Sequence, residues 1–283
     1  LTCLTSRYFV PLLSLMGPLH YELSTDFADR AQQFLSLPQQ FEEGKGMLIF
    51  KGRNEIRCFA MKGRNVVVKR FKANNRYKQW LSLFSMGKAK KSFLNGKKLS
   101  KLGINTPLPI GYVEMRRYGM VVQDYYACEL TDWQPIVLGL IVQQPYDKLL
   151  ASSFARFVAM LHEKGVLHKD LNSTNVLYRR SESGYDFQLI DINRMRFATE
   201  NTPFSEKECF QNLTLFSNND DMFHYFLCKY IESRGWSQAL LEKALDIKAA
   251  HDKHWEYKQM LKRKYKGAPD KPCGVGRADA NPK

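Results

Sequence analysis

The turn K-G-R-N occurs twice in the first quarter of the sequence, and it constrains the fold of this region more than any other feature. It occupies residues 51–54 and 62–65, and it separates three short apolar runs at 47–50, 56–60 and 66–71. A glycine in a short polar turn between brief apolar runs is typical of an antiparallel hairpin. Two such turns in succession predict a three-stranded meander.

Helical segments are expected on both sides of this meander. Residues 21–43 carry apolar side chains at helical intervals, and residues 88–102 combine helix-forming residues with lysine pairs before Gly103. Two further strands are expected at 112–115 and 119–123. The first part of the chain therefore predicts a small sheet with one main helix inserted.

From residue 146 the pattern of apolar residues becomes helical and continues to Gly165. Short strands are expected at 176–178 and 187–190, followed by helices over 205–265. A length of 283 residues suits one large domain or two lobes. We expect an α+β, bilobal fold with these parts: an uncertain N-terminal extension at 1–20, a sheet lobe at 21–123, a helical lobe at 124–267 and a disordered tail at 268–283.

The net charge of +15 is concentrated in one stretch of the sequence. Residues 56–113 contain no Asp or Glu but fourteen Lys and Arg residues. Such a stretch favours an anionic partner, for which we consider a phosphorylated glycolipid, a membrane surface and nucleic acid. Nucleic acid is not expected, because the aromatic residues among these lysines are better explained as core packing. The six scattered cysteines support neither a disulfide framework nor a zinc site.

Three polar motifs occur in an order that suits phosphoryl transfer. They are V-V-V-K ending at Lys69, H-K-D-L-N-S-T-N at 168–175, and L-I-D-I-N with its carboxylate at Asp191. Each has an ordinary structural explanation when taken alone: an edge-strand charge, an Asx-rich turn and a strand-end residue. Their order, their separation and the predicted elements around them together favour a catalytic explanation.

Each motif residue has a chemical reason for its position. Asp170 would accept the proton of an attacking hydroxyl, while Asn175 and Asp191 would offer oxygen ligands to Mg²⁺. Lys69 would bind the α- and β-phosphates of ATP. His162 and His168 are expected to pack and hydrogen-bond around the loop, with His168 as a support for Asp170 and not as a base.

The turn at 51–54 would cover the phosphates, and its candidate residues are Gly52, Arg53 and Asn54. It holds one glycine only, so it does not match the G-x-G-x-x-G loop of protein kinases.

These motifs resemble the protein-kinase-like superfamily. The segments KAKKSFLNGKKLSKLGINTPLPIGYVE, LHEKGVLHKDLNSTNVLY and LIDINRMRF are more closely similar to the lipopolysaccharide core kinases of the Kdo/WaaP type, over roughly residues 24–235. The resemblance implies an enzyme that uses ATP and Mg²⁺ to phosphorylate Kdo or heptose of the lipopolysaccharide inner core. It also implies a Kdo-lipid A acceptor, an anionic membrane surface as partner, and a location at the cytoplasmic face of the inner membrane.

Several residues depart from the protein-kinase pattern. Asn172 stands where kinases of Ser and Thr usually have Lys, the D-F-G motif is replaced by D-I-N, and no A-P-E follows. These differences disfavour a protein substrate. The helix expected at 88–102 has no acid to pair with Lys69, for which Glu55 or Glu114 are the candidates. A kinase of another small-molecule or protein acceptor, and a non-catalytic pseudokinase, remain as alternatives.

Overall fold

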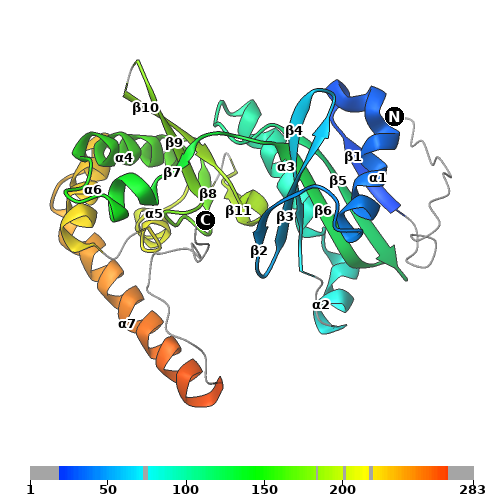
Figure 1. Ribbon diagram of the computed structural model, residues 1–283. Coiled ribbons are helices and arrows are strands. Elements are labelled where there is room, and N and C mark those ends of the chain that lie inside the picture. Colours follow the sequence, from blue (N-terminus) through cyan, green and yellow to red (C-terminus); the bar gives the residue numbers. More distant parts are fainter. Residues whose placement is uncertain (1–18, 73–75, 183, 200–201, 217–218, 267–283) are drawn as a thin grey trace. The chain divides into compact units, whose positions relative to one another are not determined.

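The computed structural model describes residues 19–72, 76–182, 184–199, 202–216 and 219–266. These residues form two compact units, shown in Figure 1. The first unit contains the described residues up to Lys98 together with Pro107–Thr131, and the second contains Leu99–Thr106 and the described residues from Asp132 onward. The expected extension at 1–20, except for Leu19 and His20, and the expected tail at 268–283 lie outside the described residues.

A six-stranded antiparallel sheet forms the framework of the first unit, in the order β1-β5-β6-β4-β3-β2. The strands are β1 (Leu19–Leu23), β2 (Met47–Lys51), β3 (Glu55–Met61), β4 (Arg64–Arg70), β5 (Pro109–Arg117) and β6 (Met120–Glu129). The predicted meander is confirmed by β2, β3 and β4, which pair in sequence order. The two strands expected near residues 112 and 119 are also present as β5 and β6, and both are longer than predicted.

The helices of the first unit cover both faces of this sheet. They are the 3-10 helix η1 (Thr25–Arg30), α1 (Ala31–Glu42), α2 (Arg76–Leu81), the 3-10 helix η2 (Ser82–Phe84) and α3 (Lys88–Lys101). Buried side chains of η1 and α1, including Phe27 and Phe34, share one core with the sheet. Phe93 of α3 shares a second core with Phe71 and Tyr126. A side chain on one face of the sheet therefore packs near η1 and α1, and a side chain on the other face packs near α3.

The predicted helix at 21–43 was wrong in its first part. Residues Leu19–Leu23 form β1, which pairs with β5 along its whole length, and only Ala31–Glu42 form an α-helix. Tertiary pairing explains the difference, because Leu19, Tyr21 and Leu23 pack against the sheet core when the segment is extended.

The second unit is mostly helical. Its helices are the π-helix η3 (Leu138–Val142), α4 (Lys148–Glu163), the 3-10 helix η4 (Ile192–Arg194), α5 (Glu206–Leu213), α6 (Asp220–Ser233) and α7 (Leu240–Lys266). Its strands are β7 (Gln134–Pro135), β8 (Val166–His168), β9 (Val176–Ser181), β10 (Gly184–Leu189) and β11 (Met195–Phe197). The second unit therefore confirms the predicted switch to a helical pattern.

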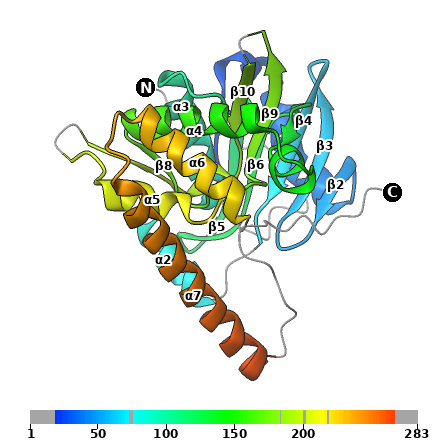
Figure 2. The ribbon, with the colours of Figure 1, turned by 90° about the vertical axis from the view of Figure 1, so that its left-hand side faces the viewer.

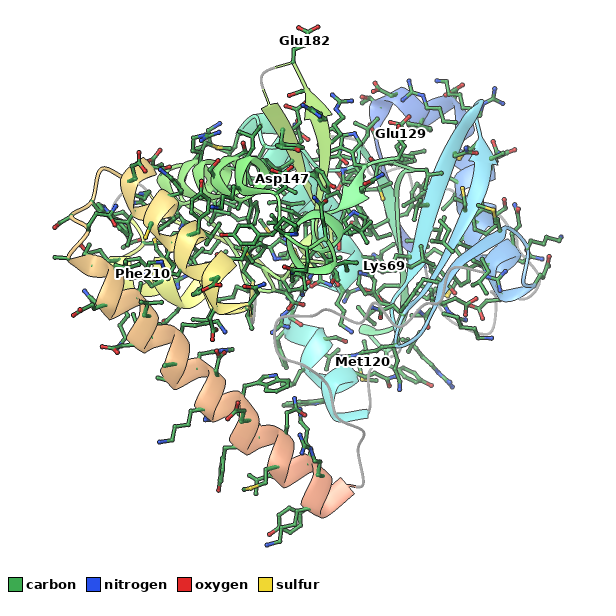
Figure 3. All side chains as sticks on the ribbon, turned by 60° about the vertical axis from the view of Figure 1, so that its left-hand side comes forward. Lys69, Met120, Glu129, Asp147, Glu182 and Phe210 are labelled. Atoms are coloured by element: carbon green, nitrogen blue, oxygen red, sulfur yellow. The ribbon has the colours of Figure 1, made fainter. Side chains whose placement is uncertain are left out.

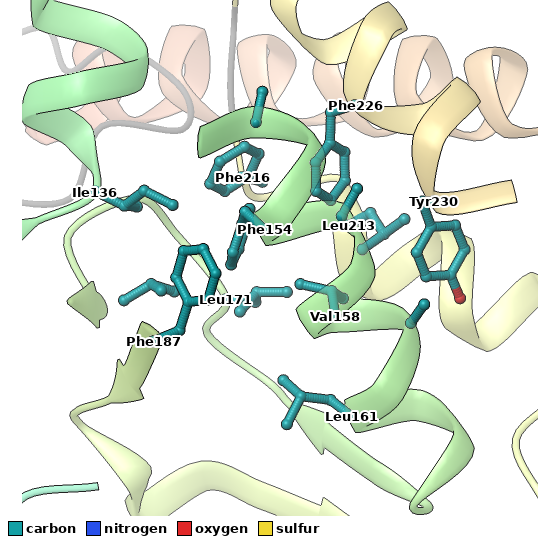
Figure 4. Packing of buried hydrophobic residues seen from close by; sticks show 14 of the residues in the cluster. Ile136, Phe154, Val158, Leu161, Leu171, Phe187, Leu213, Phe216, Phe226 and Tyr230 are labelled. Atoms are coloured by element: carbon teal, nitrogen blue, oxygen red, sulfur yellow. The ribbon is translucent and has the colours of Figure 1, made fainter. Parts of the chain in front are cut away.

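The core of the second unit is built around α4. Figure 4 shows Phe154 of α4 between Phe187, Phe216 and Phe226, and the ring centroids of Phe154 and Phe216 are 4.6 Å apart. Helix α7 contacts α5 and α6 through its first turns, and Figure 2 shows the rest of this helix extending beyond them. Among the described helices, none has the length and apolar character that crossing a membrane requires.

Candidate active site

The H-x-D-x-x-x-x-N motif forms a tight loop between β8 and β9 in the second unit. Asn175 donates from Nδ2 to the carbonyl oxygen of Asp170 at 2.9 Å, and its backbone N–H donates to the carbonyl of Asn172 at 3.0 Å. Thr174 donates from its backbone N–H to Asn172 Oδ1 at 3.0 Å. The loop is therefore closed by its own polar side chains, as expected for a segment rich in Asn, Ser and Thr.

His168 connects this loop to the strand that precedes Asp191. Its Nδ1 accepts a hydrogen bond from the Asp170 backbone N–H at 3.2 Å, and its Nε2 donates to the Ile190 carbonyl at 2.9 Å. Burial lowers the pKa of His168, which favours the neutral ring with its proton on Nε2. A buried neutral histidine with both nitrogens engaged is suited to support and not to proton transfer.

Asp191 is the second residue after β10 and adopts a left-handed backbone conformation, with φ 54°. Left-handed φ values are uncommon outside glycine, although Asp and Asn tolerate them better than other residues. Asn193 donates to Asp191 Oδ1 at 3.2 Å, and the Ile190 N–H donates to the Asn175 carbonyl at 3.0 Å. Within the second unit, Asn175 thus bonds directly to Asp170, and Asp191 is held near them through its neighbour Ile190, which bonds to Asn175 and His168.

A buried chain of polar residues lies beneath the loop, and His162 is the only one of its members that was predicted from the sequence to hydrogen-bond near the loop. Asn212 of α5 donates to the His168 carbonyl at 2.8 Å and accepts from His162 Nε2 at 3.1 Å. His162 Nδ1 accepts in turn from the Tyr230 hydroxyl at 2.7 Å. Burial lowers the pKa of His162 to about 4, so this ring is neutral at pH 7. No local pattern in the sequence indicates the contacts of Asn212.

The remaining predicted site residues lie in the first unit. Lys69 is on β4, between Ile56 of β3 and Tyr126 of β6, and Figure 3 labels it on this strand. Its Nζ lies 5.1 Å from the ring centroid of Phe71, on the side of the sheet that α3 covers. Gly52 and Arg53 are in the turn between β2 and β3.

Asn54, in the same turn, accepts a hydrogen bond on its side-chain oxygen from the Lys72 backbone N–H at 3.1 Å. This bond ties the turn to the end of β4, so Asn54 has a structural contact beside its proposed role.

The acid that would orient Lys69 cannot be Glu55. Glu55 accepts hydrogen bonds from Arg57 and Arg70, each at 2.8 Å, and Arg70 also contacts Glu42 of α1. These contacts are on the α1 side of the sheet, whereas Lys69 lies on the α3 side because neighbouring residues of a strand point to opposite faces.

Glu114 lies on the same face of the sheet as Tyr112 and is 1% exposed. Its Oε2 is bound by Arg116 at 2.9 Å, while its Oε1 has no hydrogen-bond partner. Of the two glutamates that the sequence suggested as partners of Lys69, the strand register therefore places only Glu114 on the α3 side. Arg116 already binds one of the two carboxylate oxygens of Glu114.

The antiparallel sheet with α3 on one face, the helical second unit and the H-x-D-x-x-x-x-N loop define a protein-kinase-like fold. The model of the lipopolysaccharide kinase (Kdo/WaaP) family matches residues 57–224, which is more than half of the chain. The chain therefore belongs to this family.

A comparison with solved structures supports the fold. A structure of WaaP in complex with acyl carrier protein has a TM-score of 0.56 and 15% identity, over 84% of this chain and 98% of that chain. None of the curated proteins matches the sequence.

Proposed function

We propose that this protein is an ATP-dependent kinase that phosphorylates a sugar hydroxyl of the lipopolysaccharide inner core. Kdo on a lipid A precursor is the proposed acceptor, with heptose as the second candidate. The observation that supports this assignment is the loop in which Asn175 bonds to Asp170 and to Ile190, the neighbour of Asp191, in a member of a lipopolysaccharide kinase family.

Asp170 is the proposed general base. The sugar hydroxyl oxygen forms a bond to the γ-phosphorus of ATP, the bond from that phosphorus to the β-phosphate oxygen breaks, and the hydroxyl proton moves to Asp170. His168 and Asn175 hold the Asp170 backbone through its N–H and its carbonyl. Their role is to fix the position from which the carboxylate receives the proton.

The residues proposed to hold Mg²⁺ fit a hard divalent cation. Asn175 uses its Nδ2 within the loop, so its Oδ1 is the atom that can coordinate a cation, and Asp191 adds a carboxylate. Mg²⁺ prefers such oxygen ligands and usually takes only one or two from protein, the remainder coming from water and phosphates. When bound, the ion neutralises charge on the nucleotide phosphates.

Lys69 is proposed to bind the nucleotide phosphates, together with the backbone of Gly52 and Asn54 and the side chain of Arg53. The concentration of positive charge in residues 56–113 supports an acceptor and a membrane surface that are both anionic. Because the phosphoryl donor is ATP, we propose that the protein acts at the cytoplasmic face of the inner membrane.

A transfer assay tests this function. The full chain is incubated with Mg²⁺ and ATP labelled in the γ-phosphate, and Kdo-lipid A, a heptose-bearing core acceptor, a generic protein and no acceptor are offered in parallel. Asp170→Asn should lower transfer about 10²- to 10⁴-fold with an unchanged unfolding midpoint. Asp186→Asn, which alters a carboxylate of β10 that binds Arg179, is the matched control and should retain full activity.

The outcomes separate the candidates. Label in the Kdo-lipid A sample alone supports the proposed acceptor, and label in the heptose sample alone replaces Kdo by heptose. Full activity of Asp170→Asn contradicts the assignment of the base.

A non-catalytic pseudokinase is the second candidate, because α3 supplies no acid to Lys69 and Glu55 lies on the other face of the sheet. ATP binding without transfer to any of the acceptors favours it.

A further inference from the structure

Six large apolar side chains are exposed at one end of the first unit. The 3-10 helix η2 and the residues beside it expose Trp80 (52%), Phe84 (79%) and Met86 (47%), and the β5–β6 turn exposes Tyr118 (81%). Single exposed apolar residues are ordinary, whereas a contiguous group on a soluble domain marks an interaction surface. We call this group the docking surface; its members are Trp80, Leu81, Leu83, Phe84, Met86 and Tyr118.

The docking surface is held in place by hydrogen bonds of the residues behind it. Ser82 is 5% exposed, donates to the Gln79 carbonyl at 2.5 Å and accepts from the Val121 N–H of β6 at 2.8 Å. Since Ser82 points toward the sheet, its neighbours on either side point away from it. The exposure of the apolar side chains is therefore a consequence of how this segment folds on β6.

The members of the docking surface are also close to one another. The ring centroids of Trp80 and Phe84 are 5.9 Å apart in an edge-to-face arrangement. A Cβ atom at Gly119 would lie only 3.0 Å from Leu83 Cδ2, so the β5–β6 turn that carries Tyr118 adjoins η2. The two segments that carry these exposed side chains therefore lie side by side.

The stretch of chain that carries the docking surface is rich in cations and contains no exposed carboxylate. Residues 56–113 lack Asp and Glu altogether, and the next two carboxylates along the chain, Glu114 and Asp124, are 1% and 7% exposed. Arg117 is exposed and lies 5.4 Å from the Tyr118 ring centroid. The surroundings of the docking surface therefore attract anions and repel other cationic surfaces.

We propose that the docking surface binds the surface of an anionic phospholipid membrane, with Trp80, Phe84 and Tyr118 entering the interfacial layer. Tryptophan and tyrosine favour this layer, where an apolar ring can meet a polar headgroup, and nearby cations add attraction to anionic lipids. This assignment deepens the proposed function and rests on it for its purpose, because a kinase of a lipid-linked sugar meets its acceptor at a membrane.

Vesicle binding by the full chain tests the proposal. Vesicles of phosphatidylglycerol and phosphatidylethanolamine are compared with vesicles of phosphatidylcholine, by co-sedimentation. The double variant Trp80→Ser, Phe84→Ser is compared with a matched control, Tyr257→Ser, Met260→Ser, which removes two apolar side chains of similar exposure from α7 (54% and 52%). Lipids brominated in their acyl chains provide a second readout, because they quench a tryptophan that enters the membrane.

The proposal requires binding to the anionic vesicles, loss of about tenfold or more in the partition coefficient for the Trp80, Phe84 variant, and unchanged binding of the control. Trp80→Phe should lose most of the quenching by brominated lipid. Equal binding of the two double variants, or loss in the α7 control alone, overturns it. Self-association of the wild type without vesicles that the Trp80, Phe84 variant abolishes would assign the surface to a second copy of the chain, and also overturns it.

Failure of this proposal is distinguishable from failure of the proposed function. Asp170→Asn should bind vesicles as well as the wild type does, because Asp170 belongs to the second unit. Vesicle binding without sugar phosphorylation contradicts only the proposed function. Phosphorylation of a delipidated Kdo acceptor without vesicle binding contradicts only the docking surface.

Discussion

At the scale of single residues, the structure separates groups that support the candidate site from groups that would perform chemistry. His168 engages both ring nitrogens with backbone groups, which agrees with the predicted support of Asp170. The motif spacing predicted Asp170, Asn175 and Asp191 as site residues, and their roles as base and metal ligands stay predictions. Asn212 could not be predicted, because its contact with the His168 carbonyl depends on how α5 packs and not on any local pattern.

The search for the acid that pairs with Lys69 shows that the spacing of motif residues in the sequence does not determine on which face of the sheet a residue lies. Glu55 and Glu114 were equal candidates in the sequence, and only the strand register places them on opposite faces of the sheet. Glu55 is one residue before Ile56, the partner of Lys69, and this offset of one residue is what excludes it.

Asp124 provides a prediction about stability. This carboxylate accepts from the Ala89 N–H at the start of α3, at 2.9 Å, and burial raises its pKa to about 6 from 3.8. Because the folded state holds the proton more tightly than the unfolded state, ionisation of Asp124 costs stability as the pH rises through 4 to 6. Asp124→Asn should therefore raise the free energy of unfolding by up to about 3 kcal/mol at pH 8, and by little below pH 4.

Chemical denaturation of both proteins at pH 4, 6 and 8 measures this difference. Asp132→Asn, at an exposed position, is the control and should show no such dependence on pH. A variant at Asp124 that is less stable than the wild type at pH 8 would show that the ionised carboxylate stabilises α3 by more than its burial costs.

At the scale of elements, hairpins and long helices were predictable, and short elements defined by tertiary contacts were not. The two K-G-R-N turns defined β2, β3 and β4, and the run at 88–102 became α3. The strand β1 was missed although its five residues, Leu-His-Tyr-Glu-Leu, alternate apolar and polar side chains, because the helical pattern that follows was extended back to residue 21. The pairing of β1 with β5 shows that the segment is extended.

Helix α5 begins with a capping motif that also affects the position of the catalytic-loop candidate. Ser205 and Glu208 form a reciprocal capping box at its start: the Ser205 hydroxyl accepts from the Glu208 N–H, and the Glu208 carboxylate accepts from the Ser205 N–H. Since α5 carries Asn212, the cap contributes to the position of the loop that contains Asp170.

Ser205→Ala should lower the free energy of unfolding by about 1 kcal/mol, because it removes the acceptor for the first turn of α5. Ser233→Ala is the control: the Ser233 hydroxyl donates to the Lys229 carbonyl within α6, a bond whose loss costs a helix little. Urea denaturation of the three proteins checks this. Equal midpoints for the wild type and Ser205→Ala would mean that the cap does not stabilise α5.

At the scale of the whole molecule, chemistry and charge are distributed unequally between the two units. The first unit carries Lys69, the β2–β3 turn and the stretch without acids, whereas the second carries Asp170, Asn175 and Asp191. The order of the motifs along the chain made this division predictable. The assignment of Leu99–Thr106 to the second unit was not, because a single continuous helix, α3, passes from one unit to the other.

Nucleotide binding should stabilise the whole chain by mass action. At a free concentration of MgATP about 100 times its dissociation constant, we expect about 2.7 kcal/mol and a corresponding rise in Tm. Lys69→Met should remove most of this rise, while Asp170→Asn and the exposed-site control Lys72→Met should keep it. Thermal denaturation with and without MgATP measures the effect. A full rise in Lys69→Met would contradict the role of Lys69 in phosphate binding.

The membership of Leu99–Thr106 in the second unit has a consequence for synthesis on the ribosome. Leu99 and Ile104 are buried in the second core, and the Leu189 N–H donates to the Asn105 carbonyl at 3.1 Å. These residues leave the ribosome before β5 and β6, and long before the partners they pack against. The apolar side chains of Leu99 and Ile104 therefore stay without this partner strand until Leu189, 84 residues after Asn105, has been translated. During that interval these apolar side chains are a binding site for a chaperone.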